Sequence, residues 1–244
     1  MELEENQLKE FNENGFLVLK NFAPLELCDE ILEKAKEHLQ KKQAPIETEQ
    51  EYMNLSDENI TVRRLRQVYD REEIFQKWMK NDKIRPILKQ VLNDSPVLTL
   101  AHHNSIMTKL PHESTRTFWH QDRRYWNFEN NDLVSVWLSL GDEYLDNGLL
   151  EFIPSSHKMN FSKDRFDEVD NFLDENEENK ELIKTRTHTN LQKGDVVLFH
   201  CKTLHHASKN NTDKAKISFV YTVRAKSNKP INSTRSDFKE VPLD

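Results

Sequence analysis

The N-terminal third of the chain is patterned mainly as helices. An apolar run at residues 15–19 has the length of a short strand, and apolar positions over residues 24–39 recur with a period near 3.6. Residues 63–93 return to helical spacing, whereas residues 43–59 are polar, poorly patterned and typical of a loop. We therefore expect residues 1–95 to form a mostly helical flank.

Strand-like alternation begins at about Val97. Residues 132–140 alternate cleanly, with Val134, Val136, Leu138 and Leu140 on one face and Ser135, Trp137 and Ser139 on the other. Residues 195–200 and 217–223 are further strand candidates, because they are rich in β-branched and aromatic side chains and are separated by polar turns. These patterns predict an antiparallel β core in the C-terminal part of the chain.

One polar segment interrupts this predicted core. Asp, Glu, Asn and Lys dominate residues 158–189, which indicates an exposed excursion. A charge run of this kind is more often solvated surface than a lid. We expect a single domain over residues 1–244, in which a core at 96–230 carries an acidic insertion at about 158–190.

Composition narrows the class of protein. The length of 244 residues fits one large β-rich domain, and the net charge of −7 without a Lys/Arg-rich block disfavours a nucleic-acid partner. Residues 1–11 are acidic, unlike a secretory leader, and no stretch approaches the ~18 apolar residues of a membrane span. Cys28 and Cys201 form no CxxC motif, so we expect two reduced, buried thiols. These features predict a cytoplasmic protein without a membrane span.

The first candidate for chemistry is the tripeptide His120-Gln-Asp122. In an extended segment, residues two apart project to the same side, so one imidazole and one carboxylate can bind the same metal ion. Such a tripeptide is common by chance. Aromatic pairs at 118–119 and 125–126 strengthen the case, because they could wall the site and restrict water.

A third ligand follows the turn and strand that begin at Gly194. His205 lies just beyond this strand, and its spacing favours it over His206, which would point to the opposite face of an extended chain. The other competitors, His102, His103 and His200, are interpreted as packed or substrate-side residues. Two histidines and one carboxylate form the facial triad of non-haem Fe(II), which leaves coordination positions open, whereas structural zinc fills its shell with four protein groups.

An oxygenase with such a triad needs a cation for the distal carboxylate of a chelating 2-oxo acid, because a buried dianion without a partner is very unfavourable. Lys216 and Ser218 share one face of a predicted strand downstream of His205, so an ammonium and a hydroxyl could bind the same carboxylate. Arg224 lies on the same face by parity and is the alternative.

Three ordered stretches resemble the phytanoyl-CoA dioxygenase family of Fe(II)- and 2-oxoglutarate-dependent oxygenases. They are Trp119-His-Gln-Asp-Arg-Arg-Tyr-Trp126, Asp146-Asn-Gly-Leu-Leu-Glu-Phe-Ile-Pro-Ser-Ser-His-Lys158, and Gly194-Asp through His205 to Asn210-Asn-Thr-Asp213. Residues 11–22 also resemble the N-terminal strand of the family, so the likeness spans most of the chain. The resemblance implies a mainly β fold with flanking helices, a double-stranded β-helix or cupin-like jelly roll.

The same resemblance implies roles for particular residues. Iron ligation falls on His120, Asp122 and His205, and Trp137 is implied to border the 2-oxoglutarate pocket. Lys216 stands where the family usually has arginine, which replaces a bidentate guanidinium by a point donor. The usual Pro-Gly-Ser-His reads Pro-Ser-Ser-His at residues 154–157. The intact carboxylate argues against a halogenase, since similar halogenating enzymes lose it to make room for halide.

We therefore expect a dioxygenase that uses Fe(II), 2-oxoglutarate and O2 to hydroxylate a C–H bond of a small organic substrate, with release of succinate and CO2. Two basic groups, formed by Arg63, Arg64, Arg66, Arg123 and Arg124, make an acidic substrate such as a carboxylic acid or acyl thioester a reasonable hypothesis. The alternatives are a non-catalytic cupin-like binding protein for a metal or small acid, and a zinc hydrolase or isomerase. The sequence leaves the oligomeric state open.

Overall fold

The computed structural model describes residues 1–54 and 60–243. Its α-helices are α1 (Glu5–Asn14), α2 (Leu25–Gln40), α3 (Glu49–Met53), α4 (Glu73–Met79), α5 (Arg85–Leu92) and α6 (Glu177–Ile183). Its strands are β1 (Phe16–Leu19), β2 (Ile46–Thr48), β3 (Val62–Arg66), β4 (Pro96–Lys109), β5 (Thr117–His120), β6 (Leu133–Ser139), β7 (Leu150–Phe152), β8 (Val196–His200), β9 (His205–Ala207), β10 (Lys216–Ala225) and β11 (Glu240–Pro242). Within the described residues, no helix is long and apolar enough to cross a membrane.

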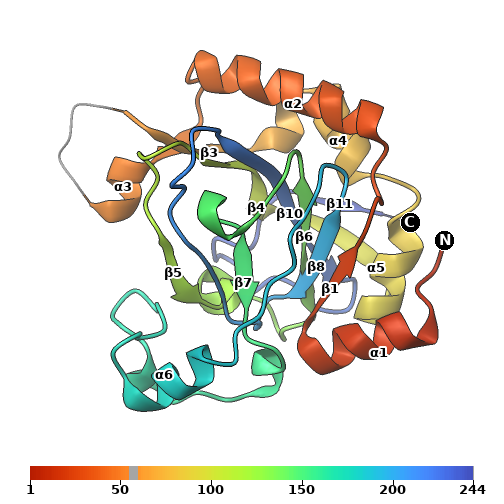
Figure 1. The fold of residues 1–244 in the computed structure, drawn as a ribbon. Helices are drawn as coiled ribbons and strands as arrows, with labels where there is room; N and C mark the ends of the chain where they lie inside the picture. The colour runs from red at the N-terminus through yellow and green to blue at the C-terminus, as the bar shows by residue number, and fades with distance from the viewer. Residues whose placement is uncertain (55–59, 244) are drawn as a thin grey trace.

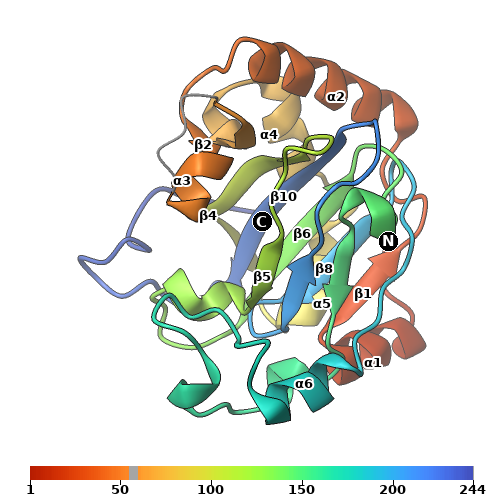
Figure 2. The same ribbon diagram turned by 60° about the vertical axis from the view of Figure 1, so that its left-hand side comes forward.

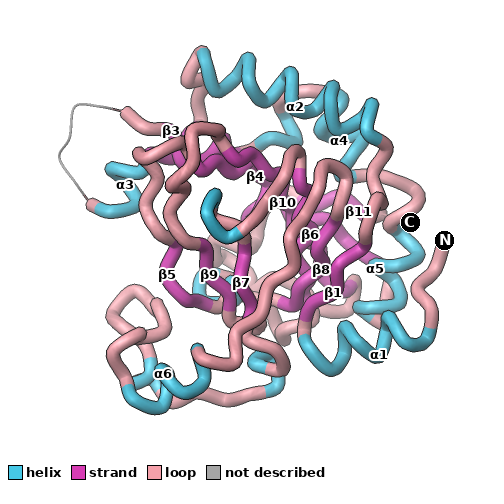
Figure 3. The backbone as a smooth tube through the Cα atoms, in the orientation of Figure 1, coloured by secondary structure: helices cyan, strands magenta, loops and turns pink. Residues whose placement is uncertain are grey.

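Two antiparallel sheets face each other (Figures 1 and 3). The larger sheet has the strand order β1-β8-β6-β10-β4-β3-β2, with β11 paired to β4, and the smaller sheet has the order β5-β9-β7. The turned view in Figure 2 shows β5 and β7 of the smaller sheet in front of the larger sheet, while α2, α4 and α5 lie behind or above it. The architecture is mainly β with flanking helices, as the sequence predicts.

The face of the larger sheet that meets the helices is aliphatic. Val134, Val136 and Leu138 of β6 are buried in one cluster with Phe75 and Trp78 of α4. Burial of each such side chain stabilises the fold by roughly 1.5–3 kcal/mol relative to exposure. The alternation predicted for β6 is therefore confirmed on its aliphatic face.

The opposite face of the larger sheet looks toward the smaller sheet and is mixed in character. Trp137 of β6 and Val220 of β10 pack with Phe152 of β7 and Phe199 of β8 in a second apolar cluster. Ser135 and other polar residues share this inward face because side chains alternate along each strand. The space between the two sheets is thus apolar in the middle and polar at its ends.

Two predictions for the N-terminal flank are wrong in part. The segment 63–93 begins as strand β3, because Arg64 lies opposite Met107 and the pairing with β4 overrides the helical spacing. The segment 43–59 is not a plain loop, since it contains β2 and α3, whose N-terminus is capped by the Thr48 hydroxyl. Residues 55–59 of that segment lie outside the described residues.

The acidic insertion is less exposed than its composition suggests. Phe172 is buried against Trp119, Ile153 and Leu204, and partly buried aromatic and aliphatic residues of the insertion surround them. Asn179 of α6 is also buried and donates to two backbone carbonyls. The prediction of an exposed excursion is therefore wrong for these residues, because a few apolar side chains suffice to anchor a polar segment.

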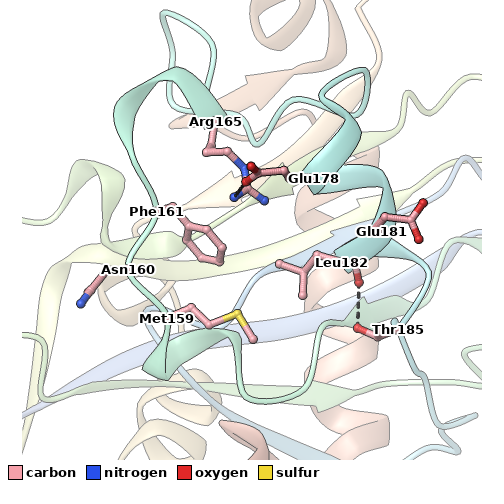
Figure 4. Close-up of a pocket in the computed structure, with 8 residues that line it drawn as sticks. All are labelled: Met159, Asn160, Phe161, Arg165, Glu178, Glu181, Leu182 and Thr185. Atoms are coloured by element: carbon pink, nitrogen blue, oxygen red, sulfur yellow. Dashed lines mark hydrogen bonds and ion pairs between the residues drawn. The ribbon is translucent and has the colours of Figure 1, made fainter.

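A surface hollow of about 520 Å³ lies within this insertion (Figure 4). Phe161 and Leu182 form its apolar wall, and the guanidinium of Arg165 is paired with Glu178. The hollow contains none of the three predicted metal ligands. It is therefore not a candidate for the chemistry that the sequence predicts.

The Gly-Asp motif has a structural reason. Gly194 adopts a positive φ of 91°, and its carbonyl accepts hydrogen bonds from the backbone amides of Phe22 and Ala23. The buried carboxylate of Asp195 accepts from the amides of Asn21 and Gln192. This turn fixes the start of β8 against the N-terminal segment, and β8 leads to the loop before His205.

Candidate metal centre

His120 and His205 are cross-strand neighbours in the smaller sheet. His120 ends β5, His205 begins β9, and the two residues lie directly opposite in this antiparallel pair. Their ring centroids are 4.3 Å apart. Asp122 follows at the start of a short 3-10 turn (Asp122–Tyr125), with its Oδ1 3.6 Å from His120 Nε2 and 3.7 Å from His205 Nε2. The structure thus brings together the three residues that the sequence selects, and all three are buried.

The donor set fits a divalent iron ion. Nδ1 of His120 donates to the carbonyl of Phe118 at 2.8 Å, and Nδ1 of His205 donates to the carbonyl of Thr203 at 2.9 Å. These hydrogen bonds fix the tautomer and leave each Nε2 with a free lone pair. One ligand atom from each of the three residues lies within 4.8 Å of the others. Two imidazole nitrogens and one carboxylate oxygen could therefore hold Fe(II) with positions left open.

Two neighbours hold the carboxylate of Asp122. Ser135 Oγ of β6 donates to Oδ2 at 2.9 Å, and His103 Nε2 of β4 lies 2.9 Å from Oδ1. Burial alone would raise the pKa of Asp122, but His103 and His205 hold it well below its usual range. The carboxylate is thus kept as an anion that faces the two imidazoles.

The two imidazoles are kept neutral. Burial, with His205 and Arg124 nearby, lowers the pKa of His120 to about 3. Burial also lowers the pKa of His205. Neutral imidazole is the form that binds metal, so both side chains are in the required state at physiological pH.

Gln121, between His120 and Asp122, braces the site. Its Nε2 donates to the carbonyl of Lys202 at 2.6 Å, and the amide of Arg123 donates to the carbonyl of Cys201 at 3.1 Å. Both bonds join the turn that carries Asp122 to the segment before β9. The middle residue of the tripeptide therefore positions the two halves of the site relative to each other.

Of the competing histidines, His103 contacts Asp122, whereas His206, His200 and His102 are engaged elsewhere. His206 lies opposite Glu151 in the β7–β9 pair, its Nε2 is 2.7 Å from the Glu151 carboxylate, and its ring stacks on Trp119. His200 accepts from a backbone amide, and His102 is hydrogen-bonded to a serine hydroxyl. His206 does not reach the site because adjacent strand residues point to opposite faces, and His205 points toward Asp122.

A cavity of about 730 Å³ opens onto this site. His103, His120, Asp122 and Trp126 are among its lining residues. Its basic lining residues are Arg63, Arg64, Arg66, Arg124 and Arg235. Arg123, which the sequence also singled out, is exposed and is not part of the lining. Val169 and Asn171 contribute to the wall, so the insertion helps to shape the cavity.

The residues expected to bind the distal carboxylate of 2-oxoglutarate surround a carboxylate of the chain itself. Lys216 Nζ is 3.2 Å from Glu143, Ser218 Oγ donates to Glu143 at 2.7 Å, and Trp137 Nε1 donates to it at 3.1 Å. Glu143 is fully buried, and the Lys216 ammonium lies 4.9 Å above the centre of the Trp137 indole. The three predicted donors therefore converge on one place in the fold, and Glu143 is in contact with all of them.

Arg224, the alternative to Lys216, is used at the other end of β10. Its Nε and Nη2 donate to Glu240 of β11 at 2.6 and 2.5 Å. Its Nη1 donates to two backbone carbonyls. The guanidinium is thus committed to the strand edge and does not share the subsite of Lys216.

A second buried lysine lies beside this subsite. Lys109 is directly opposite Lys216 in the β4–β10 pair, and its Nζ donates to the carbonyl of Thr115 at 2.5 Å. Burial, with Arg63 and Lys216 nearby, lowers the pKa of Lys109 to about 6. The folded protein therefore favours a neutral Lys109 in a pH range where the unfolded chain carries it charged.

This shift predicts a pH dependence of stability. Between pH 6 and about 10.5 the unfolded chain binds one proton more at Lys109 than the folded protein, so the free energy of unfolding rises with pH in this window. Lys109→Met should remove that rise and stabilise the ligand-free protein at pH 7 by at least about 1 kcal/mol, the equivalent of one pKa unit. Denaturant unfolding at several pH values measures it, with exposed Lys214→Met as the control. An unchanged pH slope in Lys109→Met would contradict the assignment.

Four residues of the site carry no motif in the sequence. Ser135 has the clearest signal, because it lies on the polar face of an alternating strand. His103 and Lys109 could only be placed once β4 was known to run along the inward face of the larger sheet. Glu143 gives no signal at all, since it lies in a short polar loop after β6.

Fold and site together define a class of protein. Two facing antiparallel sheets hold a buried group of two histidines and one carboxylate at one end of a cavity, which is the arrangement of mononuclear non-haem iron oxygenases. The family model for phytanoyl-CoA dioxygenase (PhyH) matches residues 11–218. The chain belongs to this family of Fe(II)- and 2-oxoglutarate-dependent dioxygenases, as the sequence resemblance implies.

The chain has distant relatives among characterised proteins. The peroxisomal phytanoyl-CoA dioxygenase of Homo sapiens is 26% identical over 222 residues, which cover 84% of this chain and 64% of the human protein. The chain thus matches less than two thirds of the length of this relative. The family model shows the family of this chain. A sequence identity of 26% does not assign the substrate of the human protein to it.

Solved structures confirm the fold. The crystal structure of EctD from S. alaskensis with bound Fe superposes with a TM-score of 0.79 at 17% identity, covering 97% of this chain and 82% of EctD. The same protein with 2-oxoglutarate and 5-hydroxyectoine gives a TM-score of 0.78 at 19% identity, covering 94% and 78%. The expected double-stranded β-helix is confirmed, and Fe and 2-oxoglutarate are the groups bound in these related structures.

Proposed function

We propose that this chain is a 2-oxoglutarate-dependent hydroxylase of a small acidic organic molecule, with iron held by His120, Asp122 and His205. The observation that carries the proposal is the pair of opposed imidazoles with fixed tautomers around one carboxylate, beside a cavity with a basic lining. With O2 as the oxidant, bound Fe(II) and 2-oxoglutarate would supply the chemistry that hydroxylates a C–H bond, with release of succinate and CO2.

The side chains of the chain position the reactants and exclude water. The hydrogen bond from Ser135 to Asp122 Oδ2 directs Oδ1 toward the two imidazoles. Phe152 and Phe199 pack beside His205, with Phe199 at 4.9 Å between ring centroids, and limit access of water from that side. A substrate would therefore approach the imidazoles from the cavity, which His120 and Asp122 help to line.

The basic lining supports an anionic substrate. The pKa of Arg235 is lowered first by burial and then by the nearby positive charges of Arg66 and Arg64. These three arginines therefore lie close together. Arg64 is paired with Glu47. In the described part of the chain, neither Arg66 nor Arg235 has a carboxylate within 4.0 Å. A carboxylate group of the substrate could pair with these two guanidinium groups.

The activity is tested with Fe(II)-loaded protein, 2-oxoglutarate and a panel of carboxylic acids and acyl thioesters. Substrate-stimulated release of succinate supports the hydroxylase. Metal binding without any decarboxylation of 2-oxoglutarate would instead favour a non-catalytic binding protein, and turnover of a substrate without 2-oxoglutarate would favour a zinc hydrolase or isomerase. Either result would remove the proposed function.

Substitution of two arginines that line the cavity tests the substrate class. Arg66→Gln and Arg235→Gln should each raise KM for an acidic substrate by about tenfold, the equivalent of one charge-assisted hydrogen bond, with little change in kcat. Arg123→Gln, outside the cavity, is the matched control. Steady-state kinetics measure the effect, and a KM unchanged in both cavity variants would contradict an anionic substrate.

We also propose that the protein acts in the cytoplasm and without a nucleic-acid partner. Cys28 and Cys201 are both buried and free, which suits a reducing compartment. The net charge of −7 does not favour a polyanion such as nucleic acid. Fractionation of cells that express the protein would test the compartment.

A further inference from the structure

Glu143 provides the carboxylate that lies between Lys216, Ser218 and Trp137. Glu143 belongs to the loop after β6, and its backbone is tied to Leu191 by two hydrogen bonds of 2.9 Å. Its side chain is fully buried and accepts from an ammonium, a hydroxyl and an indole N–H. Three such donors compensate for the burial of one carboxylate charge.

The position of this subsite is suited to the far end of a 2-oxo diacid. Ser135, which holds Asp122, and Trp137, which contacts Glu143, are neighbours on the inward face of β6, one pleat repeat or roughly 7 Å apart along the strand. On β10, Ser218 lies opposite Ser139, further from the metal end than Trp137. A five-carbon diacid that chelates iron at one end has the length to reach these donors with the other.

Two carboxylates cannot share these donors. The subsite is buried, so a second negative charge beside Glu143 would meet like-charge repulsion with little water to screen it. A diacid must therefore displace Glu143 or bind without the three donors. A 2-oxo acid that lacks the distal carboxylate does not meet this competition.

We propose that Glu143 is an internal competitor for the distal-carboxylate subsite, and that it sets the affinity of the protein for 2-oxoglutarate. This inference rests on the proposed function. In this arrangement Glu143 keeps Lys216 paired until a diacid takes its place. The residue therefore selects against dicarboxylic 2-oxo acids relative to monocarboxylic ones of the same length.

The test is an anaerobic titration of Fe(II)-loaded protein, followed by the visible charge-transfer absorption of the iron chelate. The probes are 2-oxoglutarate and 2-oxopentanoate, which has five carbons but no distal carboxylate. Glu143→Gln should lower the Kd of 2-oxoglutarate by at least about tenfold, because the competing charge is removed while the side-chain shape is kept. The Kd of 2-oxopentanoate should change by less than about threefold, which is under 1 kcal/mol.

Two further variants separate this role from a structural one. Asp142→Asn, the exposed neighbour, should leave both Kd values unchanged. Adding Lys216→Met to Glu143→Gln should abolish the gain in 2-oxoglutarate affinity, since the gain depends on the released ammonium. Near-UV circular dichroism checks the fold, and Glu143→Ala serves as the second variant, with the same expected direction, if Glu143→Gln does not fold.

The outcomes distinguish this inference from the proposed function. If the wild-type protein binds 2-oxoglutarate and both Glu143 variants bind it equally or more weakly, Glu143 is only a counter-ion that orients Lys216, and the inference is overturned while the hydroxylase stands. If neither 2-oxo acid forms a chelate with wild-type or variant protein, the proposed function fails and this inference fails with it.

Discussion

Asp122→Ala is expected to abolish iron binding and turnover. Asp122 supplies the only carboxylate of the candidate centre, and its Oδ1 lies 3.6 and 3.7 Å from the two imidazole nitrogens. Loss of a residue that merely supports a ligand typically lowers metal affinity or activity by about 10–100-fold, so loss of the ligand itself should exceed that. Metal content after Fe(II) loading and gel filtration, together with succinate release, measures both effects.

Asp132→Ala is the matched control for this variant. Asp132 is an exposed carboxylate at the start of β6, only a few residues from Ser135. It should retain iron and activity, because its side chain does not contribute to the centre. Full activity in Asp122→Ala would show that the three residues do not form the catalytic centre.

His205→Gln and His206→Gln are expected to differ sharply although the residues are adjacent. His205 presents Nε2 to Asp122 because its Nδ1 is bound to the carbonyl of Thr203. His206 points to the other face of β9 and binds Glu151. His205→Gln should therefore lose iron binding by more than about 100-fold, beyond the range for a supporting residue, whereas His206→Gln should keep it within about tenfold.

The readout for this pair is the Kd for Fe(II) or Mn(II), measured by calorimetry under anaerobic conditions. His206→Gln also removes a partly buried interaction with Glu151, so thermal unfolding should be measured alongside metal binding. Equal metal affinity in the two variants would contradict the choice of His205 as the ligand.

Much of the candidate site was predictable because its signals are local. The spacing of His120 and Asp122 on an extended segment, and the parity that separates His205 from His206, depend only on strand geometry. The alternation of β6 likewise identified its aliphatic face and its inward face with Trp137. Each of these conclusions needs a few consecutive residues and no knowledge of the rest of the fold.

Other parts could not be predicted, because they depend on pairing between distant segments. Strand β3 reads as the start of a helix until β4 supplies its partner, and Phe172 reads as part of a polar excursion until Trp119 covers it. Lys216 and Ser218 were assigned to a ligand carboxylate, and their position on one face of β10 is as expected. Their contact with Glu143 arises from a loop 73 and 75 residues away.

The sequence by itself determined the type of core, the family resemblance and the three residues that could bind a metal. Those features follow from periodicity and from the chemistry of short motifs, and both can be read from consecutive residues without knowledge of the fold. Only the tertiary structure decided which charges share a buried space, because the register of strands and the closure of loops bring together residues that no local pattern connects. The triad is thus a property of the sequence, whereas the Glu143 carboxylate beside Lys216 is a property of the fold.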